Sequence, residues 1–535
     1  MFSKAAMLAG LVLGLSAGLS AQAQIESDSM DDLGAWGQRY LSSNEAEFAT
    51  TLWRNSNDEF LLSLLQSVTT TELGPAERLL LRRIILSPAT PPQGVHAEDL
   101  LAERARLMLD LGEARAAAAL VPRLEQAAPG LDAETLAVDL DLASGQEASA
   151  CNTLNGSVKD GEYWLKLRAV CAVLRDNFSG AQLAIEVAAA QGVDDPWMVE
   201  AIFAAAGDTP NPPGARFDSG LNTALSSKAV LDTDRVTLAA DRPDLAAAAA
   251  LRPGVPAELR ARFAEIASAH DLIHPDDRRS ILLDRFEDED YEPDSPLEQA
   301  FATLRDPIST DTARAEGVIT VLNSSTENGL NTLRPTAQLF LPDLEALPQS
   351  LETAPFALDF ARAALAAGDT ALARSWLGAS EVDGIEPFDP YDIALVEAVA
   401  VIVDADTSPT RLAAIEKRLT TSTNSEAREQ QAGRVFTAWM GLGLPLSAVA
   451  RDFVASIPDA GERIPQGQLT ALKAARLGDA IGEAALMILA TTNGDVARLA
   501  PTDLAELLEV LIALDAEDVA RDLALEATAF WEDVD

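Results

Sequence analysis

Apolar residues recur along most of this chain at the three- and four-residue spacing of an amphipathic helix. Leu504, Leu507, Leu508 and Leu511 follow the i, i+3, i+4, i+7 pattern, and a similar stripe runs through residues 101–108. Strand signals are almost absent, because no Asn-Gly or Asp-Gly turn separates two alternating β-branched runs. The pattern therefore predicts an all-α fold.

Helix start signals support this prediction. Ser295-Pro296-Leu297-Glu298 combines an N-cap serine, a proline at the first helical position and a glutamate placed for a capping box. Asp195-Pro196 opens another predicted helix in a similar way.

Several predicted helices end in a recurrent motif, in which an apolar residue shortly precedes glycine and small residues open the next helix. The motif occurs at residues 109–114, 142–147, 365–370 and 476–480, and residues 174–177 and 513–516 carry Asn or Asp in place of glycine. Asn and Asp tolerate the left-handed conformation that ends a helix. Successive motifs are spaced 33 residues apart (Gly112, Gly145), then 32 (Asn177), and further on 35 and 37 (Gly443, Gly478, Asp515).

Helical hairpins of this period with a tight Gly or Asp turn resemble tetratricopeptide-type repeats. The resemblance covers residues 97–191 and 355–535, although the aromatic and proline positions of that family are only sporadically present. It implies an α-solenoid of antiparallel helix hairpins with an extended binding surface. The alternative is an irregular helical bundle in which the spacing is a coincidence.

Irregular loops interrupt the helical pattern and suggest a division of the chain. Residues 207–216 are rich in proline, residues 286–296 are acidic and contain proline, and residues 378–390 form a further break. We expect a signal peptide at 1–23, an N-terminal helical repeat region at 24–207, an irregular middle segment at 208–292 and a C-terminal repeat region at 293–535.

The N-terminus resembles a cleavable signal peptide. Lys4 precedes an apolar stretch at residues 5–19, and Ala21-Gln22-Ala23 places small residues where a signal peptidase acts. Cleavage between Ala23 and Gln24 is expected, since the apolar stretch is shorter than the roughly 20 residues that span a bilayer. No later apolar run is long enough to span a membrane, so the mature chain is predicted to be periplasmic, with outright secretion as the alternative.

The two cysteines, Cys151 and Cys171, suit an exported protein. Adjacent antiparallel helices can bring residues this far apart in sequence side by side, and an oxidising compartment favours a disulfide between them. A redox-active pair is the alternative, but the C-x-x-C spacing is lacking.

Charge excludes one class of partner. The chain of 535 residues carries 84 acidic and 40 basic residues, a formal net charge of −44, and no concentrated basic patch. Phosphate would be repelled, so nucleic acid is not expected as a partner. Any partner should be basic, or should dock on a locally basic or apolar face.

Candidate catalytic and metal-binding residues are few. His270 and His274 have the spacing of a zinc site, but His274 precedes Pro275 and no third ligand is indicated, so a helix end is the preferred interpretation. The acidic run 287–292 lacks the glycine and spaced ligands of a calcium loop. The G-x-S-x-G at residues 14–18 falls in the predicted signal peptide, and Glu26-Ser27 lacks the context of a lytic transglycosylase site. No cofactor or metal is predicted.

These observations favour a non-enzymatic protein–protein interaction scaffold of the cell envelope with an unidentified envelope protein or peptide as partner. A regulatory subunit or divergent enzyme acting on peptidoglycan or polysaccharide is one alternative, and a self-assembling envelope component is another. Four aromatic residues are candidate contact residues, with packing between helices as the preferred alternative: Trp164, Trp197, Trp376 and Trp439.

Overall fold

The computed structural model describes residues 34–533 except 125–131, 156–158, 208, 230, 239–241, 288–290, 381–383, 405–407 and 459. The predicted signal peptide and its cleavage site between Ala23 and Gln24 lie outside the described residues, as does part of the acidic run 287–292. The described residues are predominantly helical, which confirms the predicted all-α class. None of their helices is both long and apolar enough to cross a membrane.

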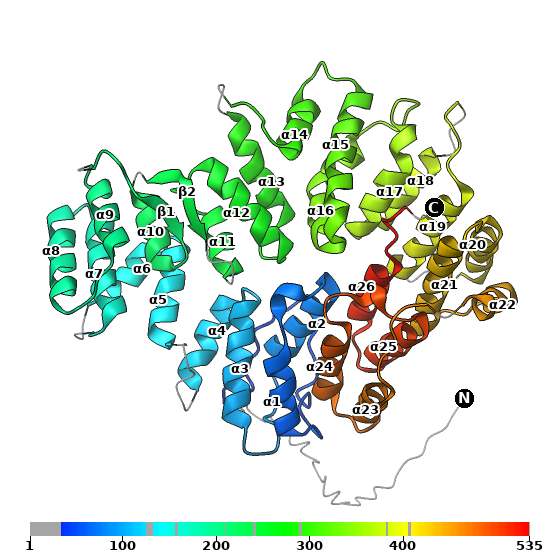
Figure 1. Ribbon diagram of the computed structural model, residues 1–535, viewed down its shortest axis with the longest axis horizontal. Coiled ribbons are helices and arrows are strands. Elements are labelled where there is room, and N and C mark those ends of the chain that lie inside the picture. The colour runs from blue at the N-terminus through cyan, green and yellow to red at the C-terminus, as the bar shows by residue number, and fades with distance from the viewer. Residues whose placement is uncertain are drawn as a thin grey trace, which may run out of the picture.

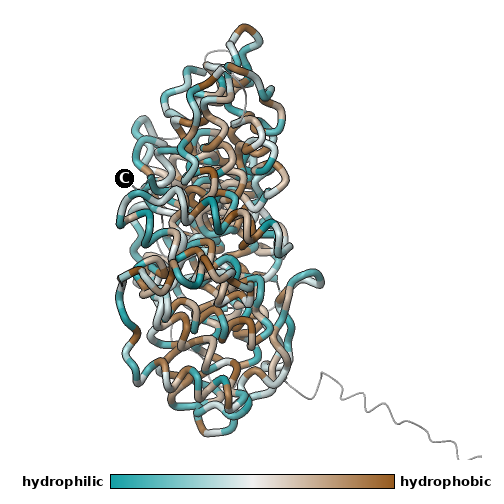
Figure 2. The backbone as a smooth tube through the Cα atoms, turned by 90° about the vertical axis from the view of Figure 1, so that its right-hand side faces the viewer, coloured by the Kyte–Doolittle hydropathy of each residue, from teal (hydrophilic) through white to brown (hydrophobic). Residues whose placement is uncertain are grey.

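The helices follow one another around a flattened body (Figures 1 and 2). The lower edge of Figure 1 holds α1 (Asp58–Ser67), α2 (Pro75–Leu86), α3 (Ala97–Asp110) and α4 (Ala114–Leu120). The left side holds α5 (Ala133–Ala143), α6 (Glu147–Asn152), α7 (Glu162–Leu174), α8 (Phe178–Ala190), α9 (Pro196–Ala205) and α10 (Gly220–Lys228). The top holds α11 (Pro243–Ala250), α12 (Ala257–Ala269), α13 (Pro275–Asp284), α14 (Pro296–Arg305), α15 (Asp311–Ser325) and α16 (Leu330–Ala346).

The remaining helices return to the starting point. The right side holds α17 (Ala357–Ala366), α18 (Thr370–Ala379), α19 (Pro390–Asp404), α20 (Pro409–Ser422), α21 (Glu426–Gly441) and α22 (Ala448–Ser456). The lower right holds α23 (Gln466–Leu477), α24 (Ile481–Thr492), α25 (Pro501–Ala513) and α26 (Glu517–Thr528). Short 3₁₀ helices are η2 (Thr70–Glu72), η3 (Val121–Arg123), η4 (Arg285–Glu287), η5 (Thr326–Asn328), η6 (Ala354–Phe356) and η7 (Val496–Arg498).

Local capping occurs where the sequence predicts it. Ser295 accepts a hydrogen bond from the Glu298 amide at 3.2 Å, and the Glu298 carboxylate accepts one from the Ser295 amide, so the capping box opens α14. Asp195 caps α9 through the Met198 amide at 3.1 Å. At the turn after α23 the left-handed residue is Asp479, with φ of 59°, and not Gly478.

Neighbouring helices along the chain pack as pairs, among them α7 with α8, α11 with α12, and α17 with α18. The leucines that predicted an amphipathic helix are all buried on α25: Leu504, Leu507, Leu508 and Leu511. The specific tetratricopeptide arrangement stays a prediction.

The described residues also contain a two-stranded parallel sheet, although strand signals in the sequence are almost absent. β1 (Gly214–Phe217) pairs with β2 (Asp232–Leu238), and α10 lies between the two strands in the sequence. The pairing is irregular between Gly214 and Arg216. The sequence gives no strand signal here, because β1 has only four residues and overlaps the end of the proline-rich loop 207–216. Gly214 is required there, since a Cβ would lie 2.2 Å from the Arg235 carbonyl oxygen.

Two hydrophobic cores fill the molecule. The larger core combines residues 36–136 with residues 282–530, and the smaller core contains residues 138–281. Figure 2 shows hydrophobic positions concentrated in the interior and hydrophilic positions along the outer loops. The cores divide near residues 137 and 282, whereas the domain boundaries near 208 and 293 remain a prediction from sequence.

The larger core joins the two ends of the described chain, because α2 packs against both α24 and α26. Glu526 accepts a hydrogen bond from the Ala76 amide at 2.6 Å, and Glu77 accepts one from the Gly494 amide at 2.9 Å. Arg83 pairs with Asp518 at 3.0 Å. We call this contact between α2, α24 and α26 the closure.

Gly494 illustrates how tightly the closure is packed. Its φ is 82°, and a Cβ at this position would lie 1.9 Å from the Glu72 carbonyl oxygen. A larger residue would therefore push the loop after α24 away from the segment that precedes α2.

Arginines connect neighbouring helices at their C-terminal ends. Arg104 of α3 donates to the Ser87 carbonyl just past α2, at 2.8 Å. Arg334 of α16 donates to the last carbonyl of α17, and Arg521 of α26 donates to Ile402 in the last turn of α19, at 3.2 and 3.0 Å. Helix C-termini expose carbonyls with no partner in their own helix, and a guanidinium satisfies them and complements the helix dipole.

The closure contains a carboxyl group with a shifted pKa. Burial raises the pKa of Glu526 to about 8, the Ala76 amide and Arg334 lower it in part, and the nearby Glu77 and Asp522 carboxylates raise it further. The folded protein therefore holds a proton on Glu526 over a pH range in which the unfolded chain, with its ordinary pKa of 4.5, has lost it.

We predict that this group makes the free energy of unfolding fall as pH rises from about 4.5 to about 8, since only the folded state retains the proton. Each unit of pKa difference corresponds to about 1.4 kcal/mol. Urea unfolding of Glu526→Gln should show a flatter pH dependence across this range than the native chain. Glu509→Gln, at an exposed position on α25, is the control and should keep the native slope. An unchanged slope in Glu526→Gln would contradict the assignment.

Candidate functional site

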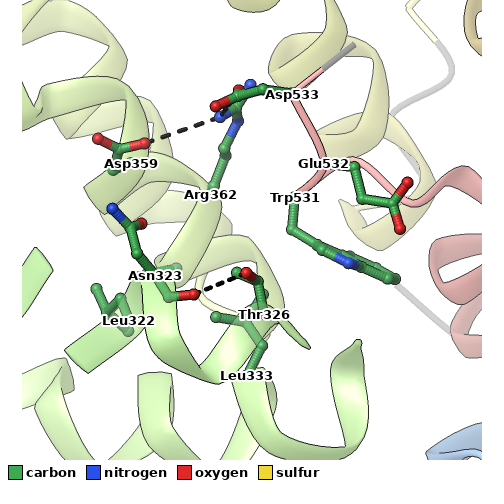
Figure 3. A pocket seen from close by; sticks show the side chains of 10 residues that line it. Leu322, Asn323, Thr326, Leu333, Asp359, Arg362, Trp531, Glu532 and Asp533 are labelled. Carbon is green, nitrogen blue, oxygen red and sulfur yellow. Dashed lines mark hydrogen bonds and ion pairs between the residues drawn. The ribbon is translucent and has the colours of Figure 1, made fainter. Parts of the chain in front are cut away.

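A pocket of about 580 Å³ lies where the C-terminal segment meets α15, α16 and α17 (Figure 3). We call it the C-terminal pocket. Its lining combines acidic, polar and apolar side chains with one arginine and one indole: Leu322, Asn323, Thr326, Leu333, Asp359, Arg362, Ala363, Trp531, Glu532 and Asp533.

The end of α26 brings Trp531 into this pocket. Ala529 adopts a left-handed conformation with φ of 44° and turns the chain away from the helix axis. Phe530 is fully buried and anchors the segment, while Trp531 lies beside Gly329, the residue that precedes α16. Of the seven tryptophans, all within the described residues, six are buried and only Trp531 is partly exposed.

Arg362 is the one basic residue that lines the pocket. This residue is 7% exposed, and its Nη1 atom donates to the Asp533 carboxylate at 2.8 Å. Asp359 and Asp392 lie 3.8 and 3.7 Å from the guanidinium, which is beyond hydrogen-bonding distance. Figure 3 shows the Asp359 and Asp533 side chains approaching the Arg362 guanidinium from different segments of the chain.

More carboxyl groups than guanidinium groups lie around Arg362, and burial raises the pKa of two of these carboxyl groups. Burial raises the pKa of Asp359, Arg362 lowers it in part, and Asp533 and Asp392 raise it further. Burial also raises the pKa of Asp392, with Arg362 and Arg428 acting in the opposite direction. The lining carries three carboxyl groups, those of Asp359, Glu532 and Asp533, against the one guanidinium of Arg362.

A second polar cavity of about 420 Å³ lies where the two cores meet, and we call it the central cavity. It joins α2, α16 and α26 of the larger core to the turn after α12 of the smaller core. Arg334 contributes a two-point ion pair with Asp522 at 2.9 and 3.3 Å. Its lining residues are Glu45, Pro75, Arg78, Leu79, Arg82, Leu111, Glu113, His270, Asp271, Leu272, Arg334, Gln338 and Asp522.

His270 and His274, which have the spacing of a zinc site, both lie at helix ends. This agrees with the interpretation preferred from the sequence. His270 follows the last residue of α12, and His274 is the N-cap of α13, with its ring nitrogen 3.3 Å from the Asp276 amide. Burial lowers the pKa of His270, and Arg78 lowers it further. In the described part of the chain, no three His, Cys, Asp or Glu side chains are grouped so that they could hold a metal ion.

Cys151 and Cys171 lie at disulfide distance, with their Cα atoms 5.7 Å apart, as the sequence predicted. Cys151 is on α6 and Cys171 is on α7, and both are buried in the smaller core. Their place inside a hydrophobic core favours a structural disulfide over a redox-active pair.

The four tryptophans named as candidate contact residues are all buried: Trp164, Trp197, Trp376 and Trp439. The Trp439 ring nitrogen donates to the Ala398 carbonyl at 3.0 Å, and that of Trp197 donates to the Gly214 carbonyl at 2.7 Å. These side chains pack between helices, and a role for them as contact residues for a partner stays a prediction.

Sequence reasoning missed the pocket residues Asp359, Arg362 and Trp531. Asp359 and Arg362 have the i, i+3 spacing of an ion pair on one helix face, which is a signal that the sequence contains. Nothing in the sequence indicates that a segment more than 160 residues further on completes the pocket.

Comparisons of the chain with protein-family models, with curated proteins and with solved structures find no significant match. The function is therefore argued from the residues of this chain alone.

We predict that Arg362→Met lowers the free energy of unfolding by about 2 to 3 kcal/mol, because Asp359 and Asp392 lose their positive neighbour in a partly buried site. Urea unfolding measures the loss. Asp533→Asn is the matched control, and since the Asp533 side chain is 84% exposed, the change there should stay under about 1 kcal/mol. Equal losses in the two variants would show that the buried acids do not depend on Arg362.

Proposed function

We propose that this chain is an exported, non-enzymatic interaction protein of the cell envelope that holds a basic protein or peptide partner. The observation that carries the proposal is the distribution of charge. Acidic residues outnumber basic ones by 84 to 40, and many of the basic residues serve contacts inside the fold.

Buried arginines illustrate this internal use of positive charge. Arg83, Arg104, Arg252, Arg278 and Arg362 are each less than 9% exposed. They bind carbonyl groups or carboxylates of other segments, as when Arg83 donates to the Asp515 carbonyl at 2.8 Å. Among the described residues, seven acidic and five basic residues are buried, so burial removes little of the acidic excess from the surface.

An acidic surface attracts basic partners and repels anionic ones, and the effect weakens as salt screens the charges. The predicted signal peptide and the disulfide-distance cysteine pair support an exported location. The C-terminal pocket supports binding, because it presents carboxylates and an indole to a ligand. A tetratricopeptide-like array would provide the extended surface that such a role uses.

We predict saturable binding of a short peptide of alternating arginine and glycine, with one peptide per protein and an affinity that falls as salt increases. Isothermal titration calorimetry on the mature chain at several salt concentrations measures both quantities. A peptide with glutamate in place of arginine is the control and should not bind.

Two results would contradict this proposal. One is the absence of binding at low salt, and the other is non-saturating uptake of many peptides, which a diffuse acidic surface without a site would produce.

A further inference from the structure

We infer that the C-terminal pocket receives a single arginine or lysine side chain of the basic partner. This inference rests on the proposed function and names the place and the chemistry of the contact. It follows from the ionic cluster around Arg362, from the position of Trp531 and from the apolar residues beside them.

The ionic cluster has more negative than positive charge. Arg362 is the one basic residue of the lining, against Asp359, Glu532 and Asp533, and Asp392 approaches the same guanidinium from α19. A second positively charged group would therefore be attracted to the pocket, and an additional carboxylate would be repelled.

The cluster is also incomplete in its hydrogen bonds. Arg362 is more than nine-tenths buried and lines the pocket, yet its Nε and Nη2 atoms have no hydrogen-bond partner. Asp359 and Asp392 face this guanidinium at ion-pair distances too long for hydrogen bonds, so they keep acceptor capacity. The Asp359 and Asp392 carboxylates are the part of this network that a cationic ligand can complete, because its N–H groups donate, whereas the Arg362 Nε and Nη2 groups are themselves donors.

Trp531 supplies a surface on which a cation can lie. Phe530 fixes its position from one side, with ring centroids 5.3 Å apart, and Gly329 leaves room for the indole from the other. Arginine and lysine cations are attracted to the face of an indole.

The remaining lining fits the rest of a long basic side chain. Leu322, Leu333 and Ala363 are apolar and can contact the methylene groups of arginine or lysine. Asn323 is exposed at the rim, and its side-chain amide makes no hydrogen bond with the described residues. Its oxygen can accept from a guanidinium or ammonium group.

The test uses the arginine–glycine peptide and a matched peptide in which citrulline replaces arginine. Citrulline has nearly the shape of arginine but carries no charge, so the comparison isolates the cation. Calorimetry gives the affinity, and tryptophan emission reports the pocket, because Trp531 is the tryptophan that solvent and ligand reach. The full mature chain is used throughout.

The pocket variants are Asp359→Asn, Trp531→Leu and Asn323→Ala, of which the last changes an exposed side chain and should fold normally. Each should weaken binding of the arginine peptide by roughly 3- to 30-fold. Trp531→Leu should also abolish the emission change. The control is Asp276→Asn, because the Asp276 side chain is 81% exposed at the start of α13 and should leave affinity unchanged.

The outcomes separate this inference from the proposed function. Weaker binding in the pocket variants but not in Asp276→Asn supports the inference. Native affinity in all three pocket variants, with binding still dependent on arginine and on salt, overturns the pocket assignment and leaves the function intact. No binding to the native chain overturns both. If the citrulline peptide binds as tightly as the arginine peptide, the assignment of a cation is overturned. The same holds if an acidic peptide binds more tightly than the arginine peptide by displacing Asp533 from Arg362.

Discussion

The docking of α2 against α24 and α26 is the interaction on which the rest of the structure depends. It brings residues 36–136 into the same core as residues 282–530, so the described helices form a closed body (Figure 1). It also fixes α26, because the Ala76 amide binds Glu526 and Arg83 binds Asp518. The segment that leaves α26 carries Phe530, Trp531 and Asp533, and the C-terminal pocket therefore forms only where the closure places this helix.

Arginine contributes to the assembly of the helices. A guanidinium that reaches the carbonyls at the end of a neighbouring helix satisfies groups that the helix itself leaves without partners. Arg104, Arg334 and Arg521 act in this way between consecutive and distant helices. Acidic residues are buried too, among them Glu77 and Glu526, so the acidity of the surface comes from the 84 acidic residues of the sequence.

Sequence reasoning succeeded where the signals are local. The helical class, the capping box at Ser295 and the cysteine pair depend on residues close together in the chain, and all agree with the structure. It failed where distant segments meet. Glu77 and Gly494, or Arg362 and Asp533, carry no pattern that identifies them as partners, because tertiary packing alone brings them together. The short strands β1 and β2 were missed for a related reason, since α10 separates them in the sequence.

Hydrogen–deuterium exchange of the full mature chain, followed by mass spectrometry, tests the closure most directly. If α2, α24 and α26 are held in one core, their amides should exchange together and slowly, as a single cooperative unit. Helix α22, with Ala450 as its one buried residue, provides an internal reference for weakly packed structure and should exchange much faster. Exchange of α2 at the rate of α22, with α24 and α26 still protected, would contradict the account, because the ends of the chain would then not share a core.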